Sequence, residues 1–263
     1  MEGRSLTNFI NVKDIQIGVG TPKICVPMTG RTVTDLLAEA ELIQSNRNYV
    51  DLVEWRVDFF SEFEDLSKVM TTLSSIHGLL EDLPLVFTFR SLEEGGEREI
   101  HPSYYFELNK AAAKSGMVDL VDVELRHREE DINQLLSVIH ENGRFGILSS
   151  HNFAATPSKS EMVEILERAK KLGGDIPKIA VMPTSARDVL ALLEATVEMQ
   201  EKYPETPIIT MSMAGQGAIS RLSGEVFGSS VTFGALKKAS APGQIEVADL
   251  KRTLEMIHHS LLK

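Results

Sequence analysis

The feature of this sequence that most constrains its fold is a regular alternation of short apolar runs with longer amphipathic segments. Between the runs, apolar residues recur at helical spacing, as in Ile132, Leu135, Leu136 and Ile139. The runs have the character of buried strands and lie at residues 23–28, 50–57, 85–90, 118–125, 144–149, 176–182, 207–213 and 231–235. Eight strand–helix units in roughly 240 residues match the number and size of a (β/α)8 barrel.

A doubly wound open sheet is the second architecture that this alternation allows. Its dinucleotide-binding form needs Gly-x-Gly-x-x-Gly after the first strand, and no such motif follows residues 23–28. No linker, low-complexity tract or repeat of fixed period divides the chain. We therefore predict one α/β domain over residues 1–263, a single (β/α)8 TIM barrel without a dinucleotide cofactor.

Local signals add detail at both ends of the barrel. Residues 9–18 alternate apolar and polar positions around Lys13-Asp14, which predicts an N-terminal β-hairpin. Ser158 and Glu161 have the spacing of a capping box, and so, more loosely, have Ser185 and Asp188. The last helix is expected over about residues 247–261, at the end of the chain. We therefore expect a single catalytic unit.

Charge and cysteine content limit the partners and the compartment. The formal net charge of −11 argues against nucleic acid or an anionic membrane as the main partner. A small anionic substrate is still allowed, because local arginines can reverse the field inside a cleft. The single cysteine, Cys25, lies in an apolar run and is expected to fill the core. With no membrane-length apolar run and no signal-peptide h-region, the chain is expected in the cytoplasm.

A lysine stands in the middle of the apolar run at 176–182, directly after Pro177. Burying an ammonium group costs several kcal/mol, so a buried lysine is either paired or gives up its proton. A neutral Lys178 amine would attack carbonyl groups. The alternative is that Lys178 lies at a strand mouth and extends its ammonium to water.

Polar side chains recur at the ends of the second and third strands. Glu54, Arg56 and Asp58 are two residues apart, so they share one face of a strand that is either polar inside or a solvated edge. Arg90 ends the third strand, and Glu94 precedes a glycine pair that lets the following loop fold back tightly.

The fourth, fifth and sixth strands also carry polar side chains that are expected at the barrel interior or mouth. Asp122 and Glu124 share a face of the fourth strand, and His151 stands at the carboxyl end of the fifth. Histidine is the usual general base near neutral pH. The sixth strand brings Lys178 next to it, which favours a catalytic pair over an isolated structural histidine.

The last strands lead into two loops with small residues. Gly215 and Gly217 follow the seventh strand and are compatible with a phosphate cradle, with Arg221 as a cation nearby. The loop after the eighth strand contains Ser240 and Gln244 and is suited to close over a ligand as a lid. No His, Cys or Asp cluster has metal-ligand spacing, so neither a metal nor another cofactor is expected.

Taken together, these motifs resemble type I 3-dehydroquinate dehydratase, the Schiff-base dehydratase of the shikimate pathway, which serves chorismate and aromatic amino acid biosynthesis. The similarity covers residues 20–262, and six motifs occur in order at spacings that fit a barrel. The motifs are Glu54-Trp55-Arg56-Val57-Asp58; Thr88-Phe89-Arg90-Ser91 with Glu94-Gly95-Gly96; Ser149-Ser150-His151-Asn152-Phe153 with Thr156-Pro157; Lys178-Ile179-Ala180-Val181-Met182-Pro183; Ser220-Arg221 with Phe227-Gly228-Ser229; and Ala239-Ser240-Ala241-Pro242-Gly243-Gln244.

The resemblance implies a function and a role for each matching residue. Lys178 would form the imine, and His151 would be the general acid/base, oriented by Glu94. Nearby arginines would help to keep the lysine amine neutral. The substrate, 3-dehydroquinate, would be held by Glu54, Arg56, Arg90, Arg221, Ser240 and Gln244. The family also implies a carbon–oxygen lyase without cofactor, usually a homodimer. Some relatives are fused to a shikimate dehydrogenase, whereas this chain stops after its eighth helix, so we expect it to be monofunctional.

Two other functions remain open from the residues alone. A lysine-dependent class I aldolase acting on a phosphorylated sugar would use the same imine, with Gly215 and Gly217 around the phosphate. A barrel retained as a binding protein would bind ligand without turnover.

Overall fold

The computed structural model describes residues 9–236 and 243–262 of the chain. Within these residues the main sheet has nine strands in the order β11-β10-β3-β4-β5-β6-β7-β8-β9. The barrel strands are β3 (Lys23–Met28), β4 (Leu52–Arg56), β5 (Leu85–Thr88), β6 (Leu120–Glu124), β7 (Phe145–Asn152), β8 (Ile176–Val181), β9 (Ile209–Ser212) and β10 (Val231–Ala235). The short β11 (Ile245–Glu246) pairs with the end of β10.

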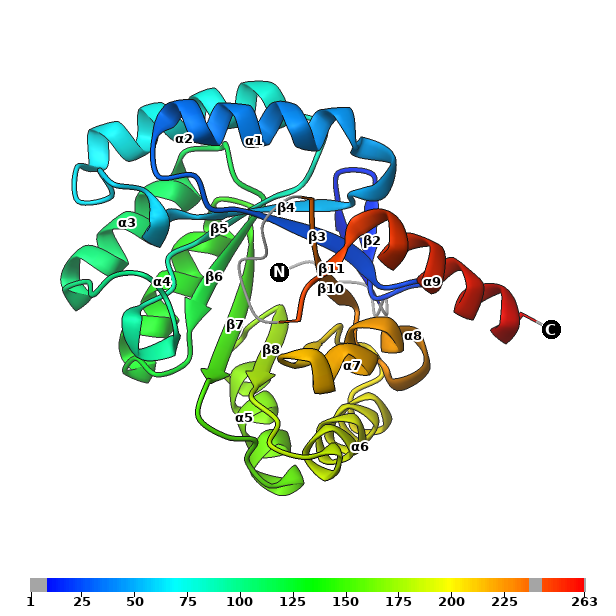
Figure 1. Ribbon diagram of the computed structural model, residues 1–263. Helices are drawn as coiled ribbons and strands as arrows, with labels where there is room; N and C mark the ends of the chain where they lie inside the picture. Colours follow the sequence, from blue (N-terminus) through cyan, green and yellow to red (C-terminus); the bar gives the residue numbers. More distant parts are fainter. Residues whose placement is uncertain (1–8, 237–242, 263) are drawn as a thin grey trace.

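The sheet closes on itself between β9 and β10. Ile208 and Ser229 form a parallel bridge there, and Ser230 N donates to Ile208 O at 2.8 Å. All pairings between neighbouring barrel strands are parallel, and helices cover the outside (Figure 1). The predicted (β/α)8 barrel is therefore confirmed.

The helices follow the strands in turn, and the predicted apolar faces point at the sheet. They are α1 (Val33–Ser45), α2 (Leu66–Leu80), α3 (Pro102–Lys114), α4 (Glu129–Glu141), α5 (Lys159–Lys171), α6 (Ala186–Lys202), α7 (Ala218–Leu222), α8 (Gly224–Phe227) and α9 (Val247–Leu261). Both predicted capping boxes are present at the starts of α5 and α6. None of the helices in residues 9–236 and 243–262 is long and apolar enough to cross a membrane.

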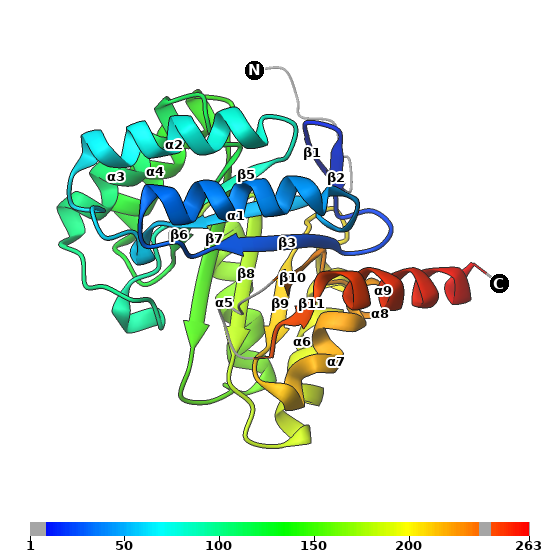
Figure 2. The same ribbon diagram turned by 45° about the horizontal axis from the view of Figure 1, so that its top comes forward.

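The N-terminal hairpin closes the end of the barrel at which the strands begin (Figure 2). It consists of β1 (Ile10–Val12) and β2 (Ile15–Ile17), paired antiparallel as predicted. Val12 and Ile17 pack with the lower barrel interior, to which Cys25 also belongs. Burial raises the pKa of the Cys25 thiol well above its usual value, in keeping with its expected place in the core.

Aspartates set the register at this same end of the barrel. Asp51, Asp119 and Asp175 each stand just before a strand and accept a hydrogen bond from the backbone of the preceding strand's start. The donors are Ile24 N at 2.7 Å, Leu85 N at 2.9 Å and Gly146 N at 2.8 Å, respectively. Because the side-chain period of a strand is two, a fixed register also fixes which side chains face inward.

Some strand limits differ from the prediction, and one difference concerns the site. The predicted run at 144–149 continues as strand to Asn152, because His151 pairs with Ala180 and Asn152 with Val181 of β8. His151 is thus held in the sheet at the carboxyl end of β7, where the sequence placed it. The runs predicted to reach residues 57 and 90 stop at Arg56 and Thr88, where the chain turns at the barrel mouth.

Candidate active site

A pocket lies at the carboxyl ends of the barrel strands, where the interior changes from apolar to charged. Every site residue predicted from the sequence that falls within the described chain lines this pocket; Ser240 lies outside the described residues. The predicted residues in its wall are Glu54, Arg56, Arg90, Glu94, His151, Lys178, Arg221 and Gln244. Met211, Met213, Phe153 and Phe233 add apolar surface.

Lys178 projects from the middle of β8 into the barrel and is only 4% exposed. Its Nζ donates to Asp122 Oδ2 at 2.8 Å and lies 3.8 Å from Glu54 Oε1. The Phe233 ring lies on another side, with its centroid 4.9 Å from Nζ. The lysine is therefore buried and paired, and does not extend to water. The charged groups in contact with Nζ are carboxylates, and Arg90 lies nearby, bonded to the other oxygen of Asp122.

Arg90 joins two acidic residues of β6 and a serine of β7 into one buried network. Its Nη2 donates to Asp122 Oδ1 at 2.8 Å, and its Nη1 donates to Glu124 Oε1 and Ser149 Oγ at 3.0 Å each. Burial alone would raise the pKa of Asp122, but Arg90 and Lys178 beside it hold that pKa well below its usual range. Asp122 is consequently a permanent anion next to the lysine.

His151 and Glu94 form the second functional pair of the pocket. Glu94 Oε2 accepts a hydrogen bond from His151 N at 3.1 Å and lies 2.9 Å from His151 Nδ1. Burial, followed by the charges of Arg90 and Lys178, lowers the pKa of His151 well below its usual value. Burial raises the pKa of Glu94 to about 8. His151 is therefore a neutral imidazole near neutral pH, with Glu94 fixing the orientation of its ring.

Two glycines let the Glu94 loop fold back over the pocket, as predicted. Gly95 adopts φ +79°, and a Cβ there would lie 2.2 Å from the Phe153 ring. Gly96 N donates to Ser91 O at 2.8 Å, and a Cβ on Gly96 would lie 1.9 Å from Arg90 O. Any side chain at Gly96 would push the loop away and move the Glu94 carboxyl from His151.

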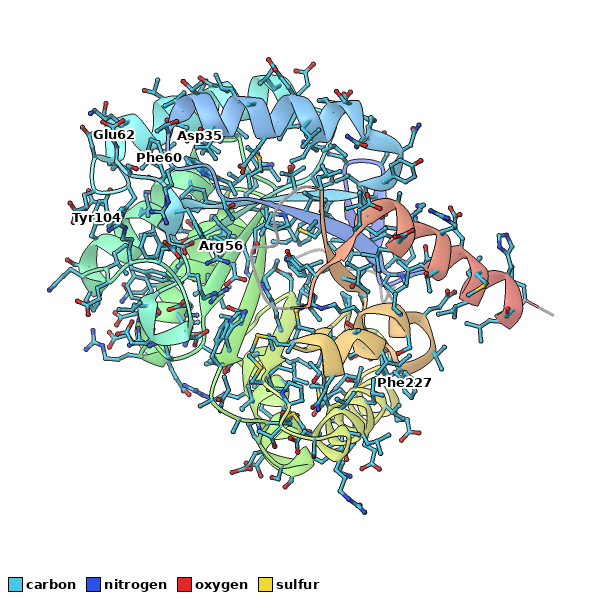
Figure 3. The ribbon with its side chains drawn as sticks, in the orientation of Figure 1. Asp35, Arg56, Phe60, Glu62, Tyr104 and Phe227 are labelled. Carbon is cyan, nitrogen blue, oxygen red and sulfur yellow. The ribbon has the colours of Figure 1, made fainter. Side chains whose placement is uncertain are left out.

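The second strand turns its polar face to the barrel interior. Glu54 is 4% exposed and Asp58 is fully buried, so the solvated-edge interpretation of this strand is wrong. Arg56, which Figure 3 labels inside the ring of helices, donates through Nε and Nη2 to both oxygens of Asp58 at 2.8 and 2.7 Å. Glu54 Oε1 accepts from Thr88 Oγ1 at 2.9 Å. Both side chains are thus preorganised at the pocket wall.

The segment after β9 supplies a buried arginine rather than a glycine cradle. A Cβ on Gly217 would lie 2.1 Å from Ser212 O, so this glycine is needed for a close turn, and neither Gly215 nor Gly217 lines the pocket. Arg221 on α7 is 2% exposed, and burial lowers its pKa to about 10. It remains a cation at the pocket wall.

Two residues in contact with Lys178 Nζ had no role assigned from the sequence. Asp122 shares a strand face with Glu124, and this spacing indicated that it faces the barrel interior. Its contact with Lys178 could not be read from the sequence, because β6 and β8 are separated by β7 in the barrel. Phe233 lies in an ordinary apolar strand and gave no signal. Within residues 9–236 and 243–262, no group of three or more His, Cys, Asp or Glu side chains is placed to hold a metal ion.

A family model for type I 3-dehydroquinase matches residues 24–261. The chain belongs to the type I 3-dehydroquinase family. It is 53% identical over 251 residues to the 3-dehydroquinate dehydratase of Listeria monocytogenes, covering 95% of this chain and 98% of the relative. The enzyme of the same name from Bacillus licheniformis is 50% identical over 256 residues, covering 97% of this chain and 100% of the relative.

A solved type I 3-dehydroquinase also has the same fold. The type I 3-dehydroquinate dehydratase from Clostridium difficile, determined with covalently modified comenic acid, superposes with a TM-score of 0.93 at 48% identity. The match covers 97% of this chain and 99% of that one. The six motifs therefore identified the correct family, and the aldolase alternative is not favoured.

Proposed function

We propose that this type I 3-dehydroquinase is a hydro-lyase that converts 3-dehydroquinate to 3-dehydroshikimate and water through an imine on Lys178. The observation that carries the mechanism is the pairing of a buried lysine with a neutral histidine in one pocket. Lys178 is 4% exposed, and His151 lies on the adjacent strand with its ring held by Glu94. A buried amine next to a positioned base is the arrangement that imine chemistry needs.

The bonds change in four steps that balance. The Lys178 ammonium gives up one proton, the neutral amine adds to the C3 ketone, and that proton leaves with the carbinolamine hydroxyl as water, which gives a protonated imine. His151 takes the C2 proton, and the electron pair of the C2–H bond moves into the enamine. The C1 hydroxyl then leaves as water with the proton held by His151, and the imine re-forms. Water hydrolyses this imine, which releases 3-dehydroshikimate and the lysine.

The state of His151 fits both of its tasks. Because its pKa is lowered, it enters the reaction as a neutral imidazole that can accept the C2 proton. General acid–base catalysis of this kind contributes about 10²- to 10⁴-fold. Electron withdrawal into the protonated imine then supplies much of the remaining acceleration.

The remaining pocket residues have the chemistry to hold the substrate. Arg221 and Arg56 offer positive charge and donors to a carboxylate, and Glu54 and Gln244 suit hydroxyl groups. Arg90 lines the same wall and also anchors the acidic network. We assign Ser240 to the substrate as well, on the motif that it shares with the family. A cytoplasmic homodimer that needs no cofactor completes the proposal.

Borohydride trapping tests this function directly. Wild-type protein incubated with 3-dehydroquinate and sodium borohydride should gain the mass of the reduced adduct, read by intact-mass spectrometry. Lys178→Ala should gain none and should lose turnover while it keeps its fold by circular dichroism. Near-normal turnover by Lys178→Ala, or turnover by the wild type without any trappable adduct, would overturn the imine mechanism.

A further inference from the structure

The lysine nitrogen of an imine enzyme carries positive charge more than once in each cycle. It is an ammonium group before it loses a proton, and it is a protonated imine both before the C2 proton leaves and after the C1 hydroxyl leaves. In a buried pocket each of these cations needs a counter-charge, because an unpaired buried charge is strongly disfavoured. An anion that stays beside Nζ through the whole cycle would meet this need in every one of these states.

Asp122 has the position that such a counterion requires. Its Oδ2 accepts the hydrogen bond from Lys178 Nζ at 2.8 Å, and both side chains are buried. Glu54 is the other carboxylate near the nitrogen, but its closest oxygen is 3.8 Å away and already accepts from Thr88. Only the Asp122 contact has the length of a charge-assisted hydrogen bond.

Asp122 is also held rigidly from its other side. Oδ1 accepts from Arg90 Nη2 at 2.8 Å and from Ser149 Oγ at 2.5 Å, and the residue is fully buried on β6. The carboxylate therefore cannot swing away when the lysine forms a bond to the substrate. Since Arg90 and Lys178 hold its pKa well below the usual range, Asp122 stays ionised and does not compete with His151 for the C2 proton.

We propose that Asp122 is the fixed counterion of the catalytic nitrogen: it aims Lys178 Nζ at the substrate carbonyl and keeps the imine protonated during the reaction. This inference rests on the proposed imine mechanism and adds to it a residue whose charge is constant. Protonation matters because only the cationic imine withdraws the electron pair of the C2–H bond effectively. The acid/base role stays with His151.

Other charged and titratable groups surround the same pocket and must be counted in any pH experiment. They are Cys25 on β3, Glu54 and Arg56 on β4, Arg90 and Glu94 after β5, Asp122 on β6, His151 on β7 and Arg221 on α7. Among the residues that the structure describes, Asp122 and Glu54 are the two carboxylates within ion-pair distance of Nζ. A comparison of these two carboxylates therefore isolates the effect of distance.

The test is the pH profile of imine trapping with cyanoborohydride, which reduces the protonated imine. In the wild type, trapping should persist to alkaline pH and fall when the imine loses its proton. In Asp122→Asn, which keeps the shape and removes the charge, the midpoint of this fall should move about 1 to 3 pH units lower. Glu54→Gln should shift the midpoint less, because its charge lies farther from Nζ.

Ser149→Ala is the matched control for packing around Asp122. It removes the hydroxyl that contacts Oδ1 but leaves the carboxylate, so the amount of adduct should fall with an unchanged midpoint. An Asp122→Asn profile that is reduced equally at all pH values, or a larger shift in Glu54→Gln, would overturn the counterion role and leave Asp122 as a packing residue. Absence of any adduct in the wild type would instead refute the proposed imine mechanism.

A measurement on the wild type keeps the inference testable if Asp122→Asn does not fold. The C=N stretching band of the bound imine shifts in D₂O only when the nitrogen carries a proton. With a fixed anion beside it, the wild-type imine should still show this shift at about pH 8. A neutral imine at that pH would contradict the proposal without recourse to any variant.

Discussion

Replacing Arg90 by methionine should destabilise the fold more than replacing any surface arginine, because Arg90 is the shared partner of several buried carboxylates. The guanidinium is 3% exposed and donates to Asp122, Glu124 and Glu94 at 2.8, 3.0 and 3.3 Å. Breaking a buried ion pair by removing one partner costs about 3–5 kcal/mol, since the other charge stays buried. Lys178 still contacts Asp122 in the variant, so we expect a loss at the lower end of this range, near 3 kcal/mol.

The pH dependence of the loss follows from Asp122. Its pKa in the folded state lies below the unfolded value of about 4, so it contributes stability that is fully present above about pH 4 and is lost as the pH falls through the folded pKa. Arg90→Met removes part of that contribution. The deficit of the variant should therefore be fully developed at neutral pH and should shrink below about pH 4.

Urea unfolding followed by fluorescence and circular dichroism measures both effects. Arg126→Met is the matched control, because Arg126 lies 3.9 Å from the same Glu124 but is 37% exposed. A partly exposed pair of this kind contributes at most about 1 kcal/mol. If Arg90→Met unfolds within about 1 kcal/mol of the wild type at neutral pH, the network does not have the energetic role that its geometry indicates.

Three further outcomes are expected at the site. His151→Ala should still form the borohydride adduct, while its turnover falls about 10²- to 10⁴-fold; failure to form the adduct would place His151 in the earlier condensation step. Since the pKa of Glu94 is raised to about 8, the pH profile of wild-type kcat/KM should show an inflection there that belongs to the Glu94–His151 pair, and Glu94→Gln should remove it; an inflection that persists would have another source. Gln244→Ala should raise KM, because Gln244 lines the pocket, and hydrogen exchange at residues 243–246 should slow when substrate binds; an unchanged KM would exclude Gln244 from the binding site.

Most of the fold was predictable from the sequence because its determinants are local. Helical periodicity, capping boxes and apolar strand runs depend on residues within a few positions of one another, and the run at 231–235 and the helix at 247–261 match β10 and α9 exactly in extent. The number of strand–helix units then limited the possible architectures to a (β/α)8 barrel or a doubly wound open sheet. The residues of the pocket were predictable for a related reason, since carboxyl ends of barrel strands meet at one mouth.

The loop that was predicted to close over the ligand lies only partly within the described residues. Residues 237–242, which include Ser240 and most of the predicted lid, lie outside the described residues, and the lid remains a prediction. Gly243 and Gln244 at its end are described: Gly243 has φ +81°, and a Cβ there would lie 2.4 Å from Ala214 O. Ala214 itself has φ +57°, so this junction of two loops is tightly constrained.

Strand alternation, which is a local pattern, indicated which side chains face the barrel interior. Which of these side chains touch one another depends on the geometry of the closed barrel. Asp122 and Lys178 are 56 residues apart, and their 2.8 Å contact depends on how strands two apart in the ring are tilted and staggered. The same holds for Arg90, whose partners come from its own loop and from β6 and β7. Strand stagger is set by the whole closed ring, from the aspartates at its base to the bridge at Ile208, and no local pattern encodes it. For that reason the sequence predicted Lys178 and His151 as the reactive pair, whereas the contact of Asp122 with Lys178 was identified only from the structure of the closed barrel.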